Sequence, residues 1–188
     1  MRDLSLHILD IVQNSIKANA SVITVHINAT AEQNQLILEI NDNGFGMDSE
    51  FLNKVEDPFI TSRKTRKVGL GIPLLKESAL KCDGNFNIYS EKNIGTKVSA
   101  TFYINHIDRL PIGDIGDTMT LLISSNTEIQ FVLIMESKNG YFKIDTKEIN
   151  RQLNGVSIAE FEVVQWLKEY ITEGVMNIFG GVLNEVYS

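Results

Sequence analysis

Residues 36–47 read Leu-Ile-Leu-Glu-Ile-Asn-Asp-Asn-Gly-Phe-Gly-Met, a predicted strand that leads directly into a glycine-rich turn. Asp42 ends the strand, and Gly44 and Gly46 allow the backbone to approach a flat ring closely. A buried carboxylate can accept a hydrogen bond from an exocyclic amine, such as that of adenine, with a contribution of roughly 1.5–3 kcal/mol. By itself Asp-Asn-Gly is typical of an ordinary turn, so a base-binding role depends on the neighbouring motifs.

A helix is predicted over residues 3–19, because apolar residues recur there at roughly helical spacing. Asp10 and Asn14 are one helical turn apart and project from one face, which His7 shares, so that His7 could hydrogen-bond Asp10. An amide oxygen such as that of Asn14 is a hard ligand suited to Mg²⁺. A carboxylate beside that ion can orient or deprotonate an attacking water or hydroxyl. We therefore predict Asn14 as the metal ligand and Asp10 as the catalytic residue; the alternative is that both simply face solvent.

Phosphate groups need a different binding element, because the chain has neither a Walker A sequence nor a dinucleotide fingerprint. Gly69-Leu70-Gly71 precedes a predicted helix over residues 72–81, whose N-terminal N–H groups and dipole favour an anion. A basic loop just upstream could close over a triphosphate; its cations are Arg63, Lys64, Arg66 and Lys67. The alternative is an ordinary turn that follows a solvated loop.

Gly95-Thr96 is the last motif and opens a predicted strand, where Gly95 permits a tight entry and Thr96 offers a hydroxyl. Each motif is weak alone. In this order, from Asp10 to Thr96, the motifs together predict a site that holds a magnesium-bound nucleoside triphosphate under a mobile lid.

Composition limits the other possibilities. The chain has 188 residues, a formal net charge of -7 and a pI near 5.0, and a general nucleic-acid partner is disfavoured because it requires a basic face. Cys82 is the only cysteine, so no internal disulfide can form, which is typical of a reducing compartment. No apolar run of about 18 residues and no signal-peptide core is found. We expect a cytoplasmic protein without membrane insertion.

The remaining elements fall into two groups, separated near residues 106–116, where proline and glycines come close together. Before this boundary the sequence predicts a strand over 22–28, a short helix over 49–55, a loop over 58–68 and paired strands over 85–90 and 97–104. Residues 117–124 are ambiguous between helix and strand. The last predicted elements are a hairpin of 129–136 and 141–145, a short helix from Thr146 to about 153, and a long helix to about 179 that begins at a capping-box pattern, Ser157–Glu160.

With these motifs assembled, residues 4–105 resemble the GHKL superfamily of ATP-binding domains, which includes histidine kinases, gyrase B-type topoisomerases, mismatch-repair ATPases and anti-sigma serine kinases. The resemblance implies that Asn14 is the magnesium ligand of the N box. It makes Asp42, Gly44 and Gly46 the adenine-binding G1 box, with Thr96 joining Asp42 through water in holding the base. Gly69 and Gly71 form the G2 box, and the ATP lid lies between residues 59 and 69. Lys17, Met47, Phe59, Thr61 and Leu70 complete the implied nucleotide-binding set.

The fold implied by the resemblance is α/β, a two-layer α+β sandwich of the Bergerat type with helices on one face of a mixed sheet. We expect residues 1–105 to form the histidine-kinase-like ATP-binding domain and residues 106–188 a small accessory α/β subdomain. Apolar segments of this second part could form a partner surface or a homodimer, although core packing explains them equally well; they lie around 131–135, 166–170 and 175–179.

The implied function is binding of ATP and Mg²⁺ with hydrolysis, or with transfer of the γ-phosphate to an unidentified protein partner in bacterial signalling. A dimerisation helix with a phosphoacceptor histidine is not found, so we expect a stand-alone domain rather than a complete histidine kinase. Asp10 stands where several family members carry a glutamate base, and a base displaced by about 1 Å can lose two orders of magnitude in rate. The alternative is therefore a nucleotide-gated protein-binding module with little or no catalysis.

Overall fold

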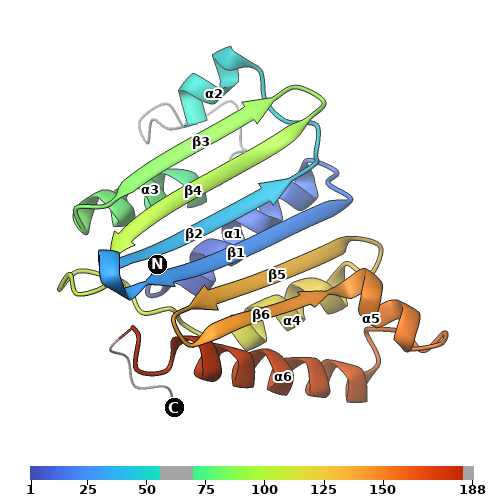
Figure 1. The fold of residues 1–188 in the computed structure, drawn as a ribbon. Helices are drawn as coiled ribbons and strands as arrows, with labels where there is room; N and C mark the ends of the chain where they lie inside the picture. Colours follow the sequence, from blue (N-terminus) through green and yellow to red (C-terminus); the bar gives the residue numbers. More distant parts are fainter. Residues whose placement is uncertain (56–69, 184–188) are drawn as a thin grey trace.

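The computed structural model describes residues 1–55 and 70–183 (Figure 1). Its helices are α1 (Leu4–Lys17), α2 (Ser49–Val55), α3 (Gly71–Lys81), α4 (Ile115–Ser125), α5 (Thr146–Gln152) and α6 (Phe161–Phe179), with a short 3-10 turn at Ala31–Gln33. Its strands are β1 (Val22–Thr30), β2 (Gln35–Asp42), β3 (Asn85–Glu91), β4 (Gly95–Tyr103), β5 (Gln130–Ser137) and β6 (Gly140–Asp145). The predicted loop over 58–68, with the basic cluster, lies entirely outside the described residues.

The strands form one six-stranded sheet in the order β3-β4-β2-β1-β5-β6. Neighbouring strands are antiparallel except β1 and β5, which run parallel, so the sheet is mixed. The α/β class with a mixed sheet is therefore confirmed, as is the pairing of the predicted strands over 85–90 and 97–104.

One face of the sheet is covered by helices. Along β1 every second side chain is buried, from Ile23 to Ala29, because a strand directs alternate residues to opposite faces. These side chains contact the apolar stripe of α1, whose Ile8 and Val12 are fully buried. Figure 1 shows α1, α3 and α4 together behind the sheet, with α6 running beside β6. A two-layer arrangement with the core between sheet and helices follows.

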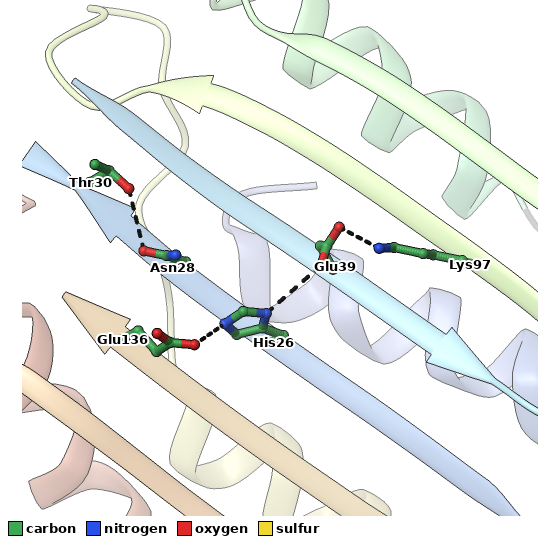
Figure 2. Close-up of polar contacts among 6 residues, drawn as sticks. All are labelled: His26, Asn28, Thr30, Glu39, Lys97 and Glu136. Atoms are coloured by element: carbon green, nitrogen blue, oxygen red, sulfur yellow. Dashed lines mark hydrogen bonds and ion pairs between the residues drawn. The ribbon is translucent and has the colours of Figure 1, made fainter. Parts of the chain in front are cut away.

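The opposite face of the sheet carries a row of linked charges (Figure 2). His26 on β1 lies between two carboxylates, with Nε2 2.7 Å from Oε1 of Glu136 on β5 and Nδ1 3.8 Å from Oε2 of Glu39 on β2. Lys97 on β4 approaches Oε1 of Glu39 at 2.8 Å. The row crosses four adjacent strands, but partly exposed pairs of this kind contribute only about 0–1 kcal/mol each.

Residues after the predicted boundary continue the same sheet. Strand β5 pairs with β1 over eight successive positions, from Val22 opposite Gln130 to Ala29 opposite Ser137. Arg109, in the connecting segment, donates hydrogen bonds to three backbone carbonyls, of Ile104, Leu110 and Leu183. The division into residues 1–105 and 106–188 stays a prediction, and the structure joins both parts through one sheet.

Two local expectations are decided by capping. The ambiguous segment 117–124 is helical, because the Asp114 carboxylate accepts a hydrogen bond from the Asp117 N–H at 2.7 Å and caps α4. The capping box expected at Ser157–Glu160 is wrong. The Ser157 hydroxyl accepts from the nearby N–H of Ala159 instead, and α6 begins only at Phe161.

The shared sheet predicts that the described elements unfold together. Leu133 is fully buried at the centre of β5, so Leu133→Ala should lower the free energy of unfolding by about 2–5 kcal/mol. Ile134→Ala, on the uncovered face of the same strand, should cost clearly less. Urea unfolding should give one transition when followed by circular dichroism and by tryptophan fluorescence. Two separate transitions would instead indicate independent domains.

Candidate nucleotide-binding site

Helix α1 supplies one wall of the site. It begins where the Asp3 carboxylate accepts a hydrogen bond from the Leu6 N–H at 3.0 Å. Asp10 and Asn14 are half-buried on the same side of this helix, and Lys17 is exposed at its last turn. The helix thus places a carboxylate, an amide and an ammonium group in succession along the chain.

The start of α3 lies directly against Asp10. A Cβ atom built on Gly71 would be 2.8 Å from Cβ and 3.4 Å from Oδ2 of Asp10, so only glycine allows the backbone to come this close. Leu70 occupies the N-cap position without a side-chain hydrogen bond to the helix and is itself exposed. The first-turn N–H groups of α3 therefore have no cap from that residue, next to the carboxylate of α1.

Asp42, the buried carboxylate at the end of β2, is held on both oxygens. Its Oδ2 accepts a hydrogen bond from the Ser15 hydroxyl at 2.6 Å, and its Oδ1 accepts from the Gly44 N–H at 2.8 Å. Gly44 lies close to α1, since a Cβ there would be 2.7 Å from the carbonyl oxygen of Ala18. The carboxylate consequently has one fixed orientation between α1 and the glycine turn.

Thr96 lies directly opposite Asp42 in the pairing of β2 with β4. Its hydroxyl is 2.8 Å from that of Ser90 on β3, and Ser90 also accepts a hydrogen bond from the Met47 N–H at 2.8 Å. Ser90 therefore joins the glycine turn to the strand pair that carries Thr96. Asp42 and Thr96, more than fifty residues apart in the chain, occupy one place in the sheet.

The glycine turn itself is fixed on two sides. Gly46 adopts φ of +61°, and a Cβ there would be 2.0 Å from the carbonyl oxygen of Glu91, so both the dihedral and the contact require glycine. On the other side the Asn43 amide oxygen accepts hydrogen bonds from the N–H groups of Ser21 and Val22, each at 2.9 Å. The turn after Asp42 is thus anchored before any ligand binds.

The structure brings several of the predicted residues into two groups. The first group lies between α1 and α3, where Gly71 contacts Asp10 and Asn14 is one turn further along α1. The second group lies at the end of the central strands and consists of Asp42, Gly44 and Thr96. Seven predicted site residues lie outside the described residues: Phe59, Thr61, Arg63, Lys64, Arg66, Lys67 and Gly69.

Sequence reasoning missed Ser15 and Ser90. Ser15 was detectable in principle, because it is a polar residue at helical spacing from the apolar residues Ile8, Ile11 and Val12 of α1. Ser90 carries no comparable signal, since a serine within a strand has no feature that marks it as a hydrogen-bonding link.

His7 is a buried residue of α1, and its neighbour is Ser78 on α3 rather than Asp10. Its Nε2 lies 3.4 Å from the Ser78 hydroxyl, and among the described residues no group hydrogen-bonds its Nδ1. Burial, which disfavours the charged ring, lowers the pKa of His7 from its ordinary 6.5 to about 4. A neutral imidazole therefore belongs to the packing between α1 and α3.

The mixed six-stranded sheet with helices packed on one face is a two-layer α/β fold. The family of histidine kinase-, DNA gyrase B- and HSP90-like ATPases matches residues 2–106, which is more than half of the chain. The chain belongs to this family.

Curated relatives are longer than this chain. It is 31% identical to Sporulation kinase D of Bacillus subtilis (strain 168) over 98 residues, covering 52% of this chain and 19% of that protein. It is 29% identical to the sensor histidine kinase YxdK of the same organism over 104 residues, covering 53% of this chain and 32% of that protein. The chain thus spans a third or less of either relative.

Among solved structures the chain is similar to the Aquifex aeolicus MutL ATPase domain complexed with ADP. The TM-score is 0.56 at 16% identity, and the match covers 84% of this chain and 70% of that one. The N-terminal domain of a DNA repair protein matches with a TM-score of 0.52 at 18% identity, over 77% of this chain and 52% of that one. These likenesses concern the fold alone. Across residues 1–55 and 70–183, no helix has the length and apolar character needed to cross a bilayer.

Burial of His7 predicts acid sensitivity. The unfolded chain takes up a proton below about pH 6.5 and the folded chain only near pH 4, so stability falls as the pH drops through this window. The full difference is on the order of 3 kcal/mol. In His7→Leu this part of the pH dependence should disappear, and in His106→Gln it should remain. Urea unfolding between pH 7 and pH 4.5 measures it; equal slopes in His7→Leu and the unmodified chain would contradict the prediction.

Proposed function

We propose that residues 1–105 bind ATP with Mg²⁺ and that the chain hydrolyses ATP or transfers its γ-phosphate to a protein partner in bacterial signalling. The observation that carries the proposal is the buried Asp42 carboxylate, which is held by Ser15 and Gly44 and lies opposite Thr96. Membership of an ATPase family supports the same ligand.

Adenine would be recognised by the acceptor sites of the Asp42 carboxylate that no protein group occupies in the described residues. An ionised carboxyl group offers about four acceptor sites, and Ser15 and Gly44 occupy one on each oxygen. The remaining sites would accept the exocyclic amine of adenine, and Thr96, opposite Asp42 in the sheet, would share a water with it. Guanine carries an oxygen where adenine has the exocyclic amine. This oxygen is itself a hydrogen-bond acceptor, so it cannot donate to the carboxylate.

Phosphates and magnesium would bind at the α1–α3 end. Asn14 would provide the hard oxygen donor that Mg²⁺ prefers, and Gly71 lets the start of α3 lie directly against Asp10. The N–H groups at the start of α3 can receive a phosphate oxygen, and Lys17 adds positive charge. When bound, the ion neutralises charge on the phosphates.

Phosphoryl chemistry is the finer part of the proposal. The two relatives described above carry the word kinase in their names, which supports this chemistry, and Asp10 would orient or deprotonate an attacking water or hydroxyl. The competing function is a nucleotide-gated binding module, which the short carboxylate of Asp10 favours, because aspartate reaches less far than glutamate.

Nucleotide binding is tested by calorimetric titration with a non-hydrolysable ATP analogue, with and without Mg²⁺. Asp42→Asn should abolish detectable binding, because its amide group cannot accept as a carboxylate does. Ser15→Ala should weaken binding about tenfold, since a hydrogen bond to a charged group contributes roughly 1.5–3 kcal/mol. Asp108→Asn, an exposed aspartate away from the site, is the control. Unaltered binding in Asp42→Asn would refute the adenine site.

Turnover is tested separately with Asp10→Asn. If Asp10 is the base, ATP hydrolysis or phosphate transfer should fall about 100-fold or more while the analogue still binds. Equal turnover in both proteins would remove Asp10 from the chemistry. Negligible turnover in the unmodified chain, with binding intact, would favour the nucleotide-gated module.

A further inference from the structure

The exposed side of helix α6 combines aromatic and acidic residues that the core does not use. Its buried side is already complete, with the fully buried residues Leu167, Ile171 and Phe179 facing the sheet and α4. The solvent side carries Glu162, Trp166, Glu169, Tyr170 and Glu173, all exposed. We refer to these five residues as the α6 surface.

Aromatic rings pack against one another along this surface. The rings of Trp166 and Tyr170 are stacked, with centroids 5.2 Å apart and planes inclined by 10°, and Tyr170 lies 5.1 Å from Phe142 of β6. Gly174 fixes this arrangement, because a Cβ there would be 2.6 Å from the Phe142 ring. Even so, 48% of Trp166 and 40% of Tyr170 remain accessible to solvent. A rigid aromatic platform is therefore available at the sheet edge.

Carboxylates flank the platform without cations of their own. Glu162 precedes Trp166 by one turn, and Glu169 and Glu173 follow it at helical spacing, so the three lie alongside the rings. Lys168, on another side of the helix, is paired with Asp117 at 2.6 Å. Over the described part of the chain, no ion pair connects any of these three glutamates to a cation. Local negative charge is left uncompensated.

Guanidinium groups match both features. Arginine stacks on the face of tryptophan or tyrosine and also forms paired hydrogen bonds with a carboxylate, whereas the compact lysine ammonium does not make the planar contact. A stacked indole with carboxylates one turn away on either side can satisfy both interactions of one arginine. The same charge repels nucleic acid phosphates and acidic peptides.

We propose that the α6 surface is a docking site for an arginine-containing segment of a protein partner. The charge of the surface and its stacked rings define this occupant, and the proposal goes beyond nucleotide binding and does not depend on it. Of the segments expected from the sequence to form a dimer or partner surface, the one around Trp166–Tyr170 exposes stacked aromatic rings. The side chains of Phe131, Leu133 and Phe179 are buried in the core, and Met176 is exposed without a ring.

Trp166 is the only tryptophan of the chain, so its fluorescence reports occupancy of this surface directly. The probe is a synthetic amphipathic peptide with arginines along one face, titrated into the whole chain at physiological salt. Matched peptides carry lysine or glutamate in place of arginine. The arginine peptide should change Trp166 emission saturably, the lysine peptide should bind about tenfold more weakly, and the glutamate peptide should not bind.

Variants separate this surface from general charge attraction. The double variant Glu169→Lys with Glu173→Lys keeps the tryptophan reporter. It should weaken binding of the arginine peptide at least about tenfold. Glu128→Lys with Glu148→Lys changes net charge equally at exposed positions elsewhere and should leave binding intact. Equal weakening by both pairs, equal binding of the lysine peptide, or no saturable change in emission would each overturn the proposal. So would a sedimentation result showing a dimer that the Glu169 and Glu173 changes dissociate.

Discussion

The hydrogen bonds on the two oxygens of Asp42 are the constraint on which the rest of the site depends. The Ser15 hydroxyl binds one oxygen from α1, and the Gly44 N–H binds the other from the glycine turn, so a single buried side chain fixes the helix, the strand end and the turn together. Thr96 lies opposite through the sheet register. A buried carboxylate is costly unless its oxygens accept hydrogen bonds. This cost explains why α1, the end of β2 and the glycine turn come together at Asp42.

Motif order predicted the N-terminal part of the fold well, because each motif has a backbone reason that is visible locally. Gly44, Gly46 and Gly71 stand where the structure allows no Cβ, and such positions can be recognised in a sequence. Ser15 and Ser90 were not predicted, because their importance comes from partners distant in the chain: Asp42 for the first, Met47 and Thr96 for the second.

In the C-terminal part of the fold, local sequence patterns predicted less of the structure. Parallel pairing of β5 with β1 depends on side chains more than a hundred residues apart, and no local motif specifies that order. The pattern Ser157–Glu160 suggested a helix start, yet the hydroxyl of Ser157 accepts from Ala159 within a turn before the helix. Trp166 and Tyr170 were recognised as apolar, but only the packing of α6 on Phe142 and α4 leaves them on the surface.

The most direct test of the account compares the affinity of the chain for ATP with its affinity for ITP, which differs in having an oxygen in place of the exocyclic amine. If the Asp42 carboxylate accepts that amine, ATP should bind about 100-fold more tightly or better, because ITP would oppose an acceptor to an acceptor. Equal affinity for the two nucleotides would contradict the account, since the fixed carboxylate between Ser15 and Gly44 would then have no part in recognising the base.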